Sequence, residues 1–94
     1  MNSYETIFLM KDDITEEQRN KVIENIQQYL TENAIIKDEE NIGKKKLAYE
    51  IRKYKYAYYY VIQFTGKADI ISELERKYRF NDDILKFITI KIDN

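Results

Sequence analysis

Basic and aromatic side chains are interleaved between residues 44 and 60, and these residue types could bind nucleic acid. The basic residues there are Lys44, Lys45, Lys46, Arg52, Lys53 and Lys55, opposed only by Glu50. The tyrosines are Tyr49, Tyr54, Tyr56, Tyr58, Tyr59 and Tyr60. Ammonium and guanidinium groups neutralise phosphates, and phenol rings stack on unpaired bases or ribose. Tyrosine and arginine are equally favoured at protein interfaces, so both kinds of partner fit this segment.

A simpler interpretation competes at each of these positions. Lysines on an exposed strand often do no more than keep it solvated, and charge alone favours that reading. Tyr58 and Tyr60 share strand parity with Ile62 and Phe64, which favours the core for both. Tyr49 fits either a core or a surface role.

Other kinds of chemistry find little support. The chain has no histidine and no cysteine, which removes the commonest metal ligand, the best proton-transfer group near neutral pH and any thiolate. It has no glycine-rich phosphate loop. The acidic clusters Asp12-Asp13, Asp38-Glu39-Glu40 and Asn81-Asp82-Asp83 lack calcium-loop spacing, and we expect them in solvated turns and helix starts. We predict no catalytic residues, no metal site and no cofactor.

Composition limits the class of protein. With 94 residues, we expect a single domain over residues 1–94. The net charge is −1, from 16 basic and 17 acidic residues, yet the signs are segregated. The stretch from Asp12 to Glu40 is mainly acidic and the stretch after Gly43 is mainly basic, so a near-neutral chain can still present a basic surface. No apolar run approaches the ~20 residues of a membrane span, and no signal peptide pattern is present, so we expect no membrane association.

Periodicity predicts six elements. The pattern gives a strand over Tyr4–Met10, a helix from Thr15 to about Thr31 or Glu32, a strand from Ala34 that passes Gly43, a strand over Tyr58–Thr65, a helix from Asp69 to about Arg79, and a strand over Leu85–Ile92. Thr15 and Gln18 fit a capping box, and Gly43 fits a bulge. We expect a turn at residues 53–56.

This order predicts an α+β fold. A β-α-β-β-α-β chain packs most economically as a ferredoxin-like sandwich, with a four-stranded antiparallel sheet and two helices on one face. The other face is left open. Because several strands carry apolar residues on both sides, we expect something else to cover that face or an edge.

Four stretches, spread over nearly the whole chain in the right order, resemble the bacterial small-subunit ribosomal protein S-six family. They are GKKKLAYEI at residues 43–51, YETI at 4–7, SELER at 72–76 and DILKF at 83–87. Two positions depart from the family pattern, Ala57 in place of a glycine and Glu50 in place of a common proline.

The resemblance implies a cytoplasmic, ribosome-associated, non-enzymatic protein. It implies contact with the central domain of small-subunit (16S) ribosomal RNA, pairing with ribosomal protein S-eighteen, and no small-molecule substrate. The RNA- or partner-binding residues it implies are Lys44, Lys45, Lys46, Tyr49, Arg52, Lys53 and Lys86. Secondary candidates are Tyr4, Glu5, Lys55 and Tyr56.

Two other functions stay open. The exposed apolar strand positions also fit a ferredoxin-like interaction or self-association module without RNA binding. An enzyme working on the open sheet is disfavoured by the missing histidine, cysteine and glycine loop, and fold analogy alone cannot support it.

Overall fold

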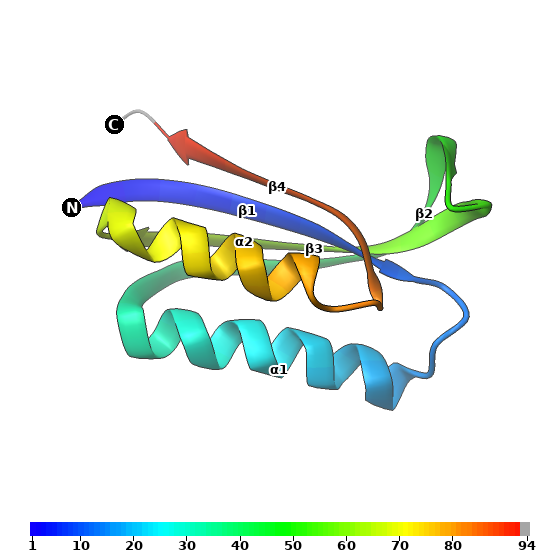
Figure 1. Cartoon of the computed structure of the whole chain (residues 1–94), viewed down its shortest axis with the longest axis horizontal. Helices are drawn as coiled ribbons and strands as arrows, with labels where there is room; N and C mark the ends of the chain where they lie inside the picture. Colours follow the sequence, from blue (N-terminus) through cyan, green and yellow to red (C-terminus); the bar gives the residue numbers. More distant parts are fainter. Residues whose placement is uncertain (93–94) are drawn as a thin grey trace.

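The computed structural model describes residues 1–92 and contains one sheet covered on one face by two helices (Figure 1). The elements are β1 (Asn2–Lys11), α1 (Glu16–Asn33), β2 (Ala34–Ile51), β3 (Tyr54–Gly66), a short 3-10 turn (Ala68–Ile70), α2 (Ile71–Arg79) and β4 (Ile84–Ile92). The strand order is β2-β3-β1-β4, and every neighbouring pair is antiparallel. The predicted ferredoxin-like α+β arrangement is confirmed.

Alternation along the strands places the core between the sheet and the helices. Tyr4, Phe8 and Met10 of β1 are buried, with Tyr60, Ile62 and Phe64 of β3 beside them. The apolar stripes of the helices close this core through Val22, Ile23, Ile26, Leu30, Leu74 and Tyr78. Burying each large side chain stabilises the fold by roughly 1.5–3 kcal/mol, and the aromatic ring of Phe8 is flanked by Tyr60 and Tyr78 at 5.5 and 5.3 Å.

A polar group inside this core is fully partnered. The hydroxyl of Thr6 lies 2.8 Å from the hydroxyl of Tyr78 and 2.8 Å from that of Thr89. Burial raises the pKa of Tyr78, so its phenol stays protonated. The network ties β1 to α2 and β4 without leaving a buried hydroxyl unpaired.

The two helices begin differently, since α1 has a side-chain cap and α2 has none. The capping box of α1 is confirmed: the Thr15 hydroxyl accepts from the Gln18 backbone N–H at 3.1 Å, and the Gln18 side chain accepts from the Thr15 N–H at 2.8 Å. The second helix was predicted to start at Asp69, but that residue lies in the 3-10 turn and α2 starts at Ile71. Within residues 1–92, no helix is both long and apolar enough to cross a membrane.

The hairpin of β2 and β3 differs most from the prediction. The turn is Arg52-Lys53, not residues 53–56, and both residues have positive φ, 49° and 71°. Two-residue hairpin turns of this kind match the twist of the strands but usually carry Asn or Gly, which hid this one from sequence reasoning. The predicted bulge is confirmed, since the register shifts between Asn41 and Gly43 and Gly43 has φ 88°. The acidic run Asp38-Glu39-Glu40 lies inside β2 rather than at an element end.

Candidate nucleic-acid interface

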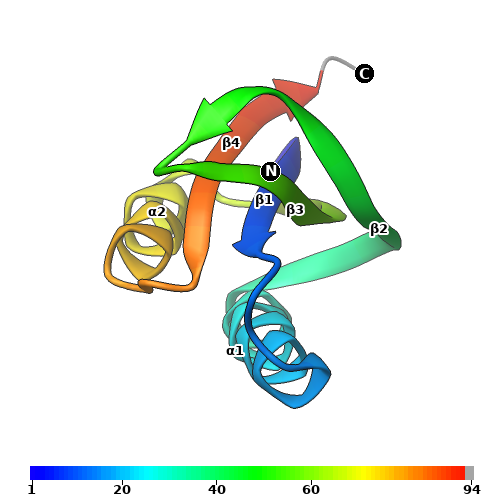
Figure 2. The same cartoon turned by 90° about the vertical axis from the view of Figure 1, so that its right-hand side faces the viewer.

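The end of the β2–β3 hairpin, residues 44–56, reaches beyond the helices and curls over the open face of the sheet (Figures 1 and 2). We call this segment the hairpin tip. Its curl has a structural cause: four residues of β2 lie between Lys46 and Ile51, where only Lys55 separates the paired residues Tyr56 and Tyr54. The three extra residues lengthen β2 relative to β3 and bend the ribbon.

A second hydrophobic cluster holds the hairpin tip in place. Leu47 is buried against Leu9, Ala57 and Leu85, and Ile7, Ile51, Tyr54 and Tyr59 pack around them. Leu9 and Leu85 belong to β1 and β4, so the tip is anchored to the sheet rather than free in solvent. A rigid support of this kind lowers the entropy lost when exposed side chains bind a partner.

Strand alternation divides the three consecutive lysines between two sides. Lys45 pairs with Ala57 on the open face, whereas Lys44 and Lys46 pair with Tyr58 and Tyr56 on the opposite side. Lys44 Nζ also lies 3.6 Å from Asp12 Oδ2 and 5.4 Å from the Tyr56 ring centre. All three lysines are exposed, but Lys44 already has a carboxylate partner.

The structure brings Tyr49 and Lys86 together although 37 residues separate them. Lys86 Nζ donates to Tyr49 Oη at 3.2 Å and lies 5.6 Å from the ring centre. Tyr49 is 65% exposed, so one face of its ring remains available for stacking. Nearby, Tyr54 Oη donates to Asp13 Oδ2 at 2.8 Å, and this bond raises the pKa of Tyr54.

The other candidates have different surroundings. Arg52, Lys53, Lys55 and Tyr56 are exposed on the hairpin tip. Glu5 lies on the open face and accepts from Gln63 Nε2 at 3.0 Å. Tyr4 is only 7% exposed and stacks on Phe64 in the core, so we leave it out of the candidate surface.

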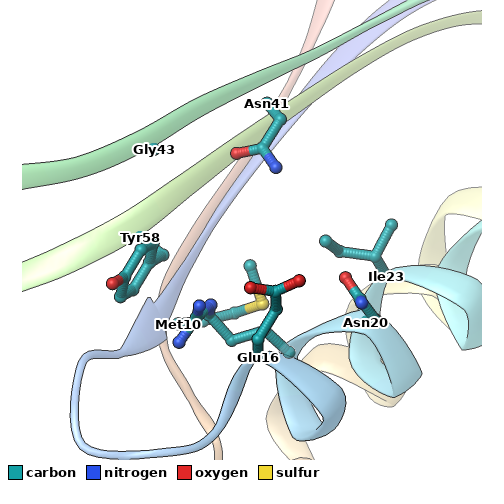
Figure 3. Close-up of a pocket in the computed structure, with 8 residues that line it drawn as sticks. Met10, Glu16, Asn20, Ile23, Asn41, Gly43 and Tyr58 are labelled. Atoms are coloured by element: carbon teal, nitrogen blue, oxygen red, sulfur yellow. The ribbon is translucent and has the colours of Figure 1, made fainter.

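Tyr58 and Tyr60 take the core side, as their parity predicts. The pKa of Tyr60 is raised to about 12, chiefly by burial and secondly by the 2.9 Å hydrogen bond that its hydroxyl donates to Glu39. Tyr58 borders a hollow of about 290 Å³ that also contacts Met10, Glu16, Ile23, Asn41 and Gly43 (Figure 3). The guanidinium of Arg19 lies 3.7 Å from the Tyr58 ring centre and donates to the Ile14 carbonyl, so it is already engaged.

The acidic clusters serve structural contacts. Asp12 pairs with Lys44, Asp13 accepts from Tyr54, and Glu39 accepts from Gln27 and Tyr60. Across residues 1–92, the fold gathers no group of three or more metal-binding side chains. The arrangement of cations and an exposed ring therefore suits the binding of anions and flat ring systems better than bond-making chemistry.

A second hollow, of about 330 Å³, lies where the hairpin tip meets the α2–β4 turn. It is lined by Arg52, Tyr78, Arg79, Ile84, Leu85, Lys86 and Phe87. Arg52 and Lys86 were predicted as binding residues, but Arg79 was missed. It occupies the last turn of α2, where a basic residue is explained by the helix dipole alone.

Comparison with known proteins shows which family this chain resembles over its whole length. A family model described as "Ribosomal protein S6" matches residues 3–91. The "Small ribosomal subunit protein bS6" of Helicobacter acinonychis is 43% identical over 95 residues, covering 100% of this chain and 67% of the relative. The protein of the same name from Campylobacter jejuni is 38% identical, covering 100% of this chain and 76% of the relative.

A solved structure extends the likeness to the backbone. The crystal structure of 30S ribosomal protein S6 from Thermotoga maritima has a TM-score of 0.93 and 30% identity, with 97% of this chain and 87% of that chain covered. The family model spans nearly all of the described residues, and the relatives match the chain from end to end. The chain belongs to the ribosomal protein S6 family.

Proposed function

We propose that this chain is a non-enzymatic component of the small ribosomal subunit that binds the central domain of 16S ribosomal RNA together with ribosomal protein S-eighteen. The observation that carries the proposal is the hairpin tip. It holds exposed cations and the exposed Tyr49 ring on a support fixed by the second hydrophobic cluster. The family membership supports the ribosomal setting.

The contacts we assign follow from exposure and charge. Lys45, Lys46, Arg52, Lys53 and Lys55 neutralise phosphates, while Tyr49 stacks on an unpaired base with Lys86 beside it. Lys44 contributes less because Asp12 already offsets its charge. The cytoplasmic, ribosome-bound location belongs to the same proposal.

The partner protein docks, in this proposal, on the open face of the sheet. Ile88 and Ile90 of β4 are 48% and 51% exposed there, and large apolar side chains at that exposure favour a protein neighbour. A chain with net charge −1 also gains from a basic partner when it approaches RNA. We therefore expect weak RNA binding by the chain alone and stronger binding by the pair.

A binding titration tests the proposal. A central-domain fragment of 16S ribosomal RNA is titrated with the chain alone and with ribosomal protein S-eighteen, each at two salt concentrations. We expect salt-sensitive binding that the partner strengthens. Binding to neither form, or a salt-independent affinity, would refute the proposal.

The exposed isoleucines also favour a second candidate, self-association through the open face. Ile88→Asp should abolish pairing with ribosomal protein S-eighteen, whereas Phe80→Asp, at an equally apolar position that is 77% exposed in the α2–β4 turn, should not. A stable homodimer of the wild-type chain in sedimentation, lost in Ile88→Asp, together with no RNA affinity, would favour the second candidate instead.

A further inference from the structure

We infer that the hollow between the hairpin tip and the α2–β4 turn binds a backbone phosphate of a single-stranded RNA segment, with Arg79 as a contact residue. This inference rests on the proposed function, because it names a site for the same RNA. Three elements supply its cations: Arg79 from α2 and Lys86 from the next element, β4, meet Arg52 from the hairpin turn, which is far from both in sequence.

The charge around the hollow favours an anion. Among the described residues that line it, three are cationic and none carries a carboxylate. The chain as a whole has net charge −1, so this concentration of positive charge is local. Arginine is well suited to the role, since its planar guanidinium donates two parallel hydrogen bonds to a phosphate.

The existing contacts of these cations leave them available. Arg79 lies 3.5 Å from Glu75, one turn earlier on the same helix, and its side chain is 61% exposed. An exposed pair of this kind is weak and is readily exchanged for a phosphate contact. Lys86 is held by the neutral Tyr49 hydroxyl, which orients the ammonium but leaves its charge in place.

The shape of the site favours a single strand over a duplex. The floor is apolar, formed by Ile84, Leu85 and Phe87, and the opening has a volume of about 330 Å³. A regular RNA helix presents its phosphates on a convex surface, whereas a splayed nucleotide can enter a hollow and place its sugar or base against apolar side chains. Phe87 is half-buried, with one ring face packed on Tyr78 at 5.0 Å.

The chain provides a matched control for Arg79. Arg76 is on the same helix, is 65% exposed, lies 3.5 Å from Glu73 and sits over the ring of Phe80. Arg79 likewise sits over the ring of Phe87. Of these two arginines, Arg79 lines the hollow and Arg76 does not. Arg79→Gln and Arg76→Gln therefore remove the same charge from similar surroundings, but only the first removes it from the proposed site.

The test is a nuclear magnetic resonance titration of the full chain with an unpaired five-nucleotide RNA of mixed sequence. We expect backbone amide shifts at residues 52, 79 and 86 that saturate together in the wild type and in Arg76→Gln, and that disappear in Arg79→Gln. Each lost contact with a single strand lowers the slope of log affinity against log salt by about 0.7. Between about 50 and about 200 mM salt, the loss of affinity should therefore be roughly 2.6-fold smaller in Arg79→Gln than in the wild type. Equal loss in both variants, or shifts confined to the other hairpin-tip residues, would overturn the inference.

A second arm separates this inference from the proposed function. Both variants are paired with ribosomal protein S-eighteen and titrated with the central-domain fragment. If the pair binds and the two variants are equal, the hollow plays no part while the proposed function stands. If neither the chain nor the pair binds RNA, both fail. A hexaglutamate peptide that shifts residues 52, 79 and 86 as strongly as RNA would assign the hollow to an acidic protein segment and overturn the RNA assignment.

Discussion

Replacing Lys45 with glutamine should weaken RNA binding more than replacing its neighbour Lys44, although the two side chains carry the same charge. Lys45 is exposed on the open face, and no salt bridge to it occurs among the described residues. Lys44 Nζ lies 3.6 Å from Asp12, whose carboxylate already offsets part of its charge. Asp12→Asn should therefore have the opposite effect on RNA affinity and increase it, because it frees Lys44 from its carboxylate partner.

The size of the effect follows from the number of cations. Within residues 1–92, six exposed cations of the proposed contact form no salt bridge with a carboxylate: Lys45, Lys46, Arg52, Lys53, Lys55 and Lys86. At about 0.7 per neutralised phosphate on single-stranded RNA, they give a slope of log affinity against log salt of at most about −4, or a loss of roughly 300-fold between about 50 and about 200 mM salt. Lys45→Gln should reduce that slope to about −3.5 and the loss to roughly 100-fold.

Filter binding over a salt series, with the partner protein present, measures the differences between these slopes, because the partner's own cations add the same amount to the slope of every variant. The wild type, Lys45→Gln, Lys44→Gln and Asp12→Asn form the set, and each variant is first checked for unchanged thermal unfolding. The smallest change in slope should belong to Lys44→Gln. Equal slopes for the two lysine variants, or weaker binding by Asp12→Asn, would show that the Lys44–Asp12 pair does not govern the contact.

Three further predictions concern the fold that supports the surface. Tyr78→Phe should lower the free energy of unfolding by about 1 kcal/mol. Thr6→Val should lower it by more, roughly 1–3 kcal/mol, because it leaves the buried Tyr78 hydroxyl unpaired. Urea unfolding measures both losses, and equal losses would contradict this account. The folded protein holds the Tyr60 proton more tightly than the unfolded chain, because its pKa is raised to about 12. The stability that the protonated phenol contributes is therefore complete below about pH 10 and is lost as pH rises through about 12. Urea unfolding over this pH range should show a smaller loss of stability in Tyr60→Phe. Replacing Arg52-Lys53 with Asn-Gly should raise the melting temperature, because left-handed backbone costs an L-residue about 1–2 kcal/mol. The same replacement should weaken RNA binding, because it removes two cations. An unchanged melting temperature would mean that the turn is not strained.

Local patterns predicted most of the fold. The capping box at Thr15, the alternation of Tyr4, Phe8 and Met10, and the bulge at Gly43 each depend on side-chain chemistry within a few residues. The hairpin turn escaped prediction because Arg52 and Lys53 are poor turn formers, and the position is imposed by the pairing of β2 with β3 on either side. Tertiary pairing overrides local preference there.

The candidate surface was predictable in composition but not in arrangement. A run of three lysines does not reveal that Lys45 faces one side and Lys44 the other, or that Asp12 pairs with Lys44. The sequence also does not place Lys86 against Tyr49, or Arg79 and Arg52 around one hollow, because both arrangements depend on the curl of the hairpin tip. Three extra residues in β2 and the burial of Leu47 produce that curl.

Strain and anchoring at the hairpin tip have one explanation in common. Arg52 and Lys53 have positive φ, which makes the turn less stable than Asn-Gly would make it. The turn therefore carries two positive charges at a cost in stability. Leu47 and Ile51 bury apolar area on Leu9 and Leu85, which offsets that cost and keeps Arg52 near Arg79 and Lys86. If this account is correct, Leu47→Ala should weaken RNA binding while leaving every cation in place, because the loosened tip no longer presents them together. An Leu47→Ala variant that loses stability but keeps full RNA affinity would show that anchoring serves the fold alone.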